Sequence, residues 1–189
     1  RNDGQVKAAT RLAVLALALG ETGHATELAE LKSDPWPRTS FVSTLTEWNC
    51  ELADWAKMCK SVDSGCLRSA LCLGIGSMSA MDQLALSEWQ RVWTNWYINA
   101  LDSGTHSAAR WALTSQKLPV PTRFTDAAKS ADWQHSPHGI VLLRIPSGEF
   151  SRVDVFAPGS RRHTVVLDTD LWISDREISI QQFHQDRKS

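Results

Sequence analysis

The stretch DSGTHSAARWAL, residues 102–113, shows the pattern that decides the fold of the N-terminal part of this chain. An aspartate and a glycine come first, and alanines and larger apolar residues then recur at spacings of three and four. Aspartate favours the N-cap position of a helix, and glycine suits the turn that precedes it. The stretch therefore predicts a turn and then a helix whose small side chains let a neighbouring helix approach closely.

The same pattern opens three earlier segments of the 189-residue chain. Asp3, Asp34 and Asp63 each precede a helical pattern, and the four aspartates lie 31, 29 and 39 residues apart. Periods of this size are typical of helical repeats, in which stacked helix pairs share one continuous core. We therefore expect residues 1–117 to form antiparallel helix pairs stacked in chain order, an α-solenoid in which contacts join adjacent units.

Three further helices are expected between these units, at residues 25–31, 45–59 and 87–101. The last of them places four aromatic residues on one side: Trp89, Trp93, Trp96 and Tyr97. Such a stripe could bind a partner, but aromatic residues at helical spacing belong more often to the core. We therefore favour the core interpretation.

The composition changes after about residue 116, beyond the helix expected from residue 102 onward. Pro119 and Pro121 disfavour a helix and favour extended chain, so we place a linker at residues 118–138. Alternating apolar residues then predict strands at residues 139–145, 153–155 and 163–167, with a helix beginning near residues 178–183. The expected fold class is mainly α, with a small, incomplete β-rich α+β unit at residues 139–189.

Two family resemblances add to this interpretation of the fold. The Asp-x-Gly-x-x-x-Ala-Ala repetition over residues 1–117 resembles HEAT repeats, which are stacked antiparallel helix pairs. Residues 139–184 are similar to the opening of a formylglycine-generating-enzyme-like domain, also known as a sulfatase-modifying-factor domain. The motifs that carry the second resemblance are Ile145-Pro146-Ser147-Gly148-Glu149-Phe150, His163-Thr164-Val165-Val166-Leu167, Leu171-Trp172-Ile173, Glu177-Ile178-Ser179 and Gln182-Phe183.

The second resemblance implies a domain whose true catalysts oxidise a substrate cysteine with copper, held by a cysteine pair far along the domain. No cysteine follows Cys72 in this chain, so we assign no catalytic, cofactor-binding or metal-binding residue. Glu177, His163 and Trp172 match the family pattern and are interpreted as scaffold. Ser151-Arg152-Val153 departs from the x-Met-Gly that usually follows the phenylalanine.

The cysteines are expected to be structural. Cys50, Cys59, Cys66 and Cys72 form no C-x-x-C pair, and their neighbours are apolar and helical. We expect buried thiols, with a disulfide or a metal site as alternatives.

Three other motifs are also interpreted as structural. His135 and His138 could hold a metal on a helix, but the proline between them makes a regular helix unfavourable. Gly74 and Gly76 are expected to end a helix rather than to cradle a phosphate. The basic cluster at residues 161–163 is expected to be a solvated turn.

The charge and hydropathy of the chain narrow its possible partners. A formal net charge of -1 gives no argument for binding nucleic acid or an anionic membrane. The most apolar stretch, residues 12–19, is too short to cross a bilayer. We therefore expect no nucleic acid partner and no transmembrane segment in these residues. A protein partner is expected through the helical repeats.

The two family resemblances together imply a piece of a larger bacterial multidomain protein. We expect its helical repeats to act as a protein-interaction scaffold that precedes a formylglycine-generating-enzyme-like domain. Two alternatives remain: the upstream part of a cysteine-oxidising enzyme, or the regulatory arm of a serine/threonine kinase, which rests on analogy alone. Enzymatic activity of the parent protein and its compartment, cytoplasmic or tethered to a membrane, are left open.

Overall fold

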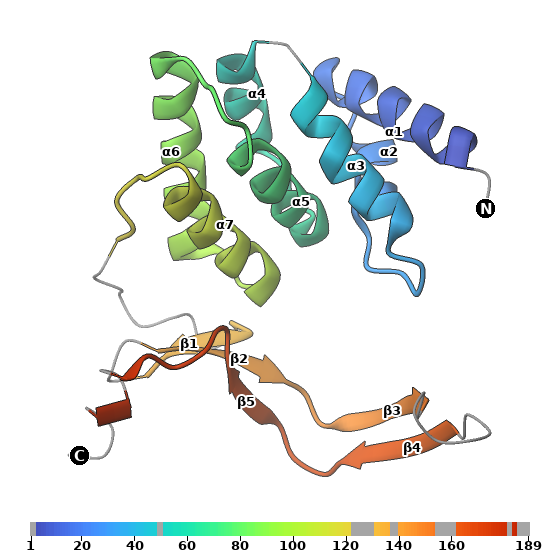
Figure 1. Ribbon diagram of the computed structural model, residues 1–189, viewed down its shortest axis with the longest axis vertical. Helices are drawn as coiled ribbons and strands as arrows, with labels where there is room; N and C mark the ends of the chain where they lie inside the picture. The colour runs from blue at the N-terminus through green and yellow to red at the C-terminus, as the bar shows by residue number, and fades with distance from the viewer. Residues whose placement is uncertain are drawn as a thin grey trace. The chain divides into compact units, whose positions relative to one another are not determined.

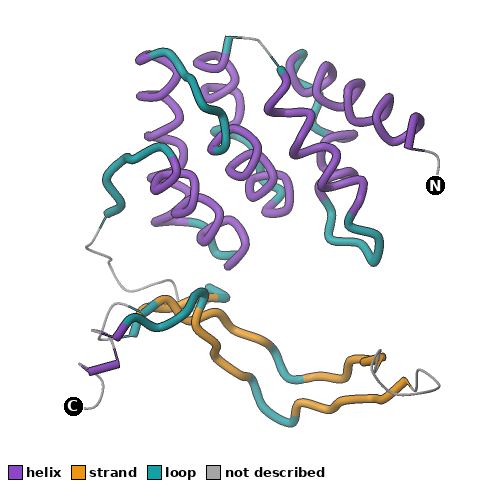
Figure 2. Tube along the Cα trace, viewed as in Figure 1, coloured by secondary structure: helices purple, strands orange, loops and turns teal. Residues whose placement is uncertain are grey.

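The computed structural model describes residues 3–48, 51–121, 131–136, 140–153, 162–180 and 183–184. The chain divides into two compact units, residues 1–125 and 126–189. The described part of the first unit holds seven helices (Figures 1 and 2): α1 (Asp3–Ala18), α2 (Gly23–Ala29), α3 (Trp36–Glu47), α4 (Leu52–Cys59), α5 (Gly65–Gly76), α6 (Gln83–Asn99) and α7 (Ser103–Ser115). The described part of the second holds five strands: β1 (Trp133–His135), β2 (Val141–Ile145), β3 (Gly148–Val153), β4 (Arg162–Leu167) and β5 (Leu171–Ser174).

Four helices of the first unit lie side by side in chain order. Helix α1 packs on α3, α3 packs on α5, and α5 packs on α7 (Figure 1). These are the four helices that begin at or just after the repeated aspartates. Of the other helices, α2 contacts α1, α3 and α5, while α4 packs on α6 and α6 packs on α7. The chain is thus mainly helical, as its sequence predicts.

Glycines allow α5 to fit between its two neighbours. A Cβ added at Gly74 would lie 2.8 Å from the Cβ of Leu45 in α3, and one added at Gly76 would lie 2.8 Å from the Cβ of Ala112 in α7. Both glycines lie in the last turn of α5, so the expectation that they end a helix is confirmed. Larger side chains here would have to displace α3 or α7, because cores are packed too densely to absorb extra atoms.

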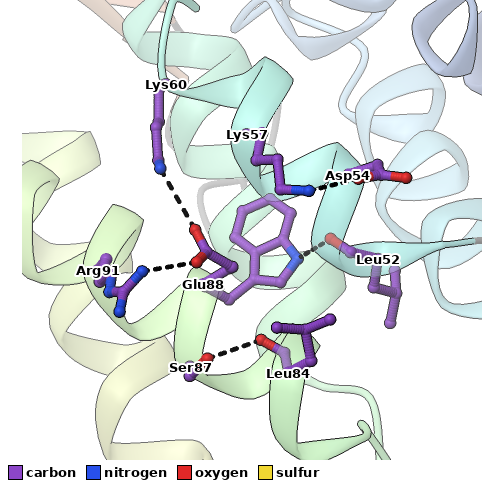
Figure 3. A network of polar contacts seen from close by, with 9 residues as sticks. Leu52, Asp54, Lys57, Lys60, Leu84, Ser87, Glu88 and Arg91 are labelled. Carbon is purple, nitrogen blue, oxygen red and sulfur yellow. Dashed lines mark hydrogen bonds and ion pairs between the residues drawn. The ribbon is translucent and has the colours of Figure 1, made fainter.

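The aromatic stripe of α6 belongs to the core, as expected. Trp89 and Trp93 are fully buried, and Trp96 and Tyr97 are 3% and 2% exposed. The indole N–H of Trp89 donates to the carbonyl oxygen of Leu52 at 3.0 Å, which joins α6 to the start of α4. This bond belongs to the α4–α6 contact that Figure 3 shows from close by. The tryptophan stripe is therefore a packing surface in this fold.

The prediction of a single helix at residues 45–59 is wrong. Helix α3 ends at Glu47 and α4 begins at Leu52, with Trp48 in an extended conformation after α3. The rings of Trp48 and Trp55 nevertheless stack at 6.4 Å between centroids. The apolar spacing continues across the break because both tryptophans pack against the same core, so periodicity alone could not reveal the interruption.

The repeated aspartates do not all cap their helices. A carboxylate oxygen of Asp102 accepts a hydrogen bond from the backbone N–H of Thr105 at 2.6 Å, which is N-cap geometry. Before α5, however, the cap is Ser64, whose hydroxyl accepts from the N–H of Leu67 at 3.2 Å. Asp63 lies one residue too early and instead pairs with a nearby arginine.

The second unit contains two small antiparallel sheets. One has the strand order β1-β2-β5, and the other is the two-stranded pair β3-β4. Strand β1 falls within residues 118–138, which we expected to be a linker. Trp172 and Phe183 are 39% and 51% exposed. The residues expected to begin a helix are described only in part; there the N–H of Phe183 donates to the carbonyl oxygen of Ser179 at 3.0 Å.

In the described part of the chain, no helix combines the length and the hydrophobicity that a bilayer crossing requires.

Candidate functional site

The surface of the first unit is hollowed where α1 lies against α3. One cavity of about 430 Å³ is lined by Arg11, Leu12, Leu15, Thr44, Glu47 and Trp48. A second, of about 220 Å³, is lined by Lys7, Arg11, Trp36, Thr39, Ser40, Ser43, Thr44 and Glu47. The two cavities share Arg11, Thr44 and Glu47 and therefore adjoin, and we name them together the α1–α3 groove.

The two helices run in the same direction along this groove. Lys7, near the start of α1, shares a cavity with Trp36, the first residue of α3. Leu15, near the end of α1, shares the other with Trp48, which follows α3. The hydroxyl oxygens of Thr10 and Thr44 lie 3.1 Å apart and join the helices beneath the groove.

The apolar end of the groove is built from leucines that α1 does not use in its core contacts. Leu12 and Leu15 are 58% and 45% exposed. The core side of α1 consists of Ala13, Val14 and Leu17, which are fully buried. An amphipathic surface helix normally carries polar residues opposite such a buried stripe. The exposed side of α1 therefore carries an apolar patch at this end of the groove.

The cations of the groove have no acidic partner among the residues that the structure describes. Lys7 and Arg11 lie four residues apart on α1 and so project from the same side of the helix. Within the described residues neither makes an ion pair, whereas Lys57, Lys60 and Arg91 are each paired with a carboxylate. Glu47 on the α3 wall likewise makes no ion pair with a described residue. The groove thus presents two free cations against one free carboxylate, beside an apolar patch.

The other hollows described on the helical unit are weaker candidates for a binding site. A shallow hollow of about 580 Å³ on α6 is lined mainly by polar side chains. Its one charged residue, Arg91, already pairs with Glu88 at 2.6 Å. Near the end of α5, the amide of Gln116 donates to the carbonyl oxygens of Gly76 and Met78, which gives it a structural role.

The cysteines mostly behave as the sequence predicts. Cys59 and Cys72 are buried free thiols, Cys66 is half-buried, and Cys50 lies outside the described residues. Burial raises the pKa of Cys59 to about 12. Burial also raises the pKa of Cys72 well above its usual value, with smaller contributions from Cys59 and Asp102. These thiols therefore stay protonated at neutral pH and are poor nucleophiles.

The β-rich unit brings no catalytic cluster together in its described residues. His163 pairs across the β3-β4 ladder with Arg152, while Trp172 lies on β5 and Glu177 follows it. None of the His, Cys, Asp and Glu groups in the described part of the chain is arranged to hold a metal ion. The sequence also lacks any cysteine in this unit, so the residues present do not fit the copper chemistry that the resemblance implies.

One polar contact in this unit is structural. The carboxylate of Asp170 accepts hydrogen bonds from the backbone N–H of Ser147 at 2.8 Å and from Nε of Arg144 at 2.7 Å. These bonds hold the pKa of Asp170 below its usual value. They tie the end of β2 to the turn before β5, at a solvent-exposed position.

The remaining sequence motifs do not meet at a site. His135 lies in β1, and His138 is outside the described residues, as is Arg161 of the basic cluster. The α1–α3 groove, in contrast, did not emerge from the sequence motifs. The sequence features that correspond to the groove are the basic residues at positions 7 and 11 and the leucines at positions 12 and 15. The structure places all four outside the buried stripe of α1.

Comparison of the chain with protein-family models, with curated proteins and with solved structures gives no match.

Proposed function

We propose that the helices of residues 3–115 form a HEAT-like α-solenoid that acts as a protein-interaction scaffold. The observation that carries this proposal is the order of packing, in which α1, α3, α5 and α7 lie side by side as they follow in the chain. Stacked repeats of this kind bury a shared core while leaving extended surfaces for partners. The α1–α3 groove, with its uncovered leucines and unpaired cations, is the proposed contact surface.

We further propose that this scaffold belongs to a bacterial multidomain protein, in which a formylglycine-generating-enzyme-like domain follows the repeats. The support is the order of the similar motifs, which fall on consecutive strands. The Ile145 motif joins β2 to β3, the His163 motif lies on β4, and the Trp172 motif lies on β5. Because the unit lacks cysteines, no oxidase chemistry is assigned to these residues.

A peptide selection tests the scaffold function. The whole chain of residues 1–189 is immobilised and challenged with a displayed random peptide library, beside an unrelated helical protein as the control. We expect selective enrichment of peptides that bind the chain in solution by fluorescence anisotropy. Hydrogen exchange should then show protection within residues 3–115 when peptide is bound. No selective enrichment, or protection confined to the strands β1–β5, would refute the scaffold role.

A further inference from the structure

We infer that the α1–α3 groove binds an amphipathic helical segment of a partner protein, with an acidic residue one turn from a bulky apolar residue. The carboxylate of that segment would lie against Lys7 and Arg11, and its apolar side chain against Leu12, Leu15 and Trp48. This inference rests on the proposed scaffold function and names the chemistry of its partner.

The charge of the groove selects an acidic ligand. Lys7 and Arg11 have no ion-pair partner in the described part of the chain, and together they outnumber Glu47, so the groove carries a formal net charge of about +1 at neutral pH. This sign opposes the formal net charge of -1 of the whole chain. A carboxylate brought to the two cations would neutralise charges that no described residue neutralises, and complementary charges chiefly determine which partners are accepted.

The spacing of the groove residues matches that of a helical ligand. Lys7, Arg11 and Leu15 follow each other at intervals of four along α1, which corresponds to roughly 6 Å per interval on a helix. A ligand helix laid along the groove places its own residues four apart at the same interval. An acidic residue opposite Arg11 therefore places an apolar residue opposite Leu15, in the manner of amphipathic helices bound in apolar grooves.

A charge-swap selection tests this inference. The probe is a displayed library of helix-forming peptides about 15 residues long, in which the variable positions are Glu, Lys, Leu or Ala. On the wild-type chain we expect enrichment of peptides with Glu four positions from Leu. On the double variant Lys7→Glu, Arg11→Glu we expect the preference at the charged position to change from Glu to Lys. The best wild-type peptide should bind this variant roughly tenfold more weakly or worse.

A matched control separates local from general charge effects. The double variant Lys117→Glu, Arg152→Glu makes the same change in net charge at exposed residues that do not line the groove. It should retain the preference for Glu, and both variants should keep the wild-type thermal midpoint because all four side chains are exposed. A second variant, Leu15→Asn, should weaken every selected peptide without reversing the charge preference.

The outcomes distinguish this inference from the scaffold function on which it rests. Enriched peptides that show no preference for Glu, or whose preference survives the charge swap, would overturn the groove assignment while leaving a scaffold that binds elsewhere. Absence of any enrichment would overturn both. Self-association of the chain in analytical ultracentrifugation, lost in Leu15→Asn, would make a second copy the occupant and would also overturn the inference.

Discussion

Gly76 in α5 and Ala112 in α7 lie so close together that a Cβ on Gly76 would come within 2.8 Å of the Cβ of Ala112 and 3.0 Å of its Cα. Real Cβ atoms do not approach other atoms this closely, so the contact depends on the absence of a side chain. It fixes how near α5 and α7 can pack.

Replacement of this glycine gives the first prediction. Glycine to alanine in a helix normally stabilises by up to about 1 kcal/mol. We expect Gly76→Ala to do the opposite and to destabilise the chain by roughly 1–3 kcal/mol, because the added methyl group forces α5 and α7 apart. Urea unfolding followed by far-ultraviolet circular dichroism measures the change.

Gly23 provides the control for that substitution. It is the first residue of α2, it is exposed, and a Cβ built there meets nothing within 4 Å. Gly23→Ala should therefore be neutral or slightly stabilising. Equal effects of the two substitutions would show that the close approach of α5 and α7 does not exist.

The buried alanine face of α7 gives the second prediction. Ala109 is fully buried, as its position in the repeat pattern suggests. Ala109→Asp should lower the free energy of unfolding by roughly 3 kcal/mol or more, since an unpaired carboxylate would be desolvated in the core. Ala8→Asp, at an exposed position of α1, should change it by less than about 0.5 kcal/mol. A wild-type thermal midpoint for Ala109→Asp would contradict the assigned face.

The third prediction concerns the two core thiols. At pH 8, iodoacetamide should alkylate half-buried Cys66 well before Cys59 and Cys72, which are buried and protonated. Peptide mass spectrometry measures the extent of alkylation at each cysteine separately. Rapid modification of Cys59 in the folded chain would show that the core between α4 and α5 is open.

The raised pKa of Cys59 also has a consequence for stability. In the unfolded chain this thiol ionises near its ordinary pKa of 9.0, but in the fold it does so only near 12. The protonated thiol therefore contributes stability that is fully present below pH 9 and is lost as the pH rises towards 12. Replacement of Cys59 by alanine should flatten the fall of the urea midpoint across this pH range.

Much of the helical unit could be predicted from local sequence signals. The aspartate-led turns identify the helices α1, α3, α5 and α7, because capping and turn chemistry act within a few residues. The aromatic stripe from Trp89 to Tyr97 identifies a buried face for the same local reason. The boundary between α3 and α4 was missed, because Trp48 and Trp55 continue the apolar spacing through a break that tertiary packing dictates.

The candidate site was harder to predict, because it depends on which helices become neighbours. Arg11 and Glu47 are 36 residues apart in the sequence, yet both line the same cavities. No local sequence pattern indicates that these two residues become neighbours. Only the structure shows that Leu12 and Leu15 fall outside the stripe of α1 that faces the core, because the spacing of the apolar residues in this helix does not separate the two faces.

The distance between α1 and α7 tests the proposed chain-ordered stack most directly. Spin labels are attached to cysteines introduced at exposed Ala8 in α1, Ser43 in α3 and Thr114 in α7, with Cys50 and Cys66 replaced by alanine. Neighbouring helices pack about 8–10 Å apart, so three steps should make the Ala8–Thr114 distance about 20 Å longer than the Ala8–Ser43 distance. Two similar distances would mean that α1 folds back towards α7, and would contradict the chain-ordered stack.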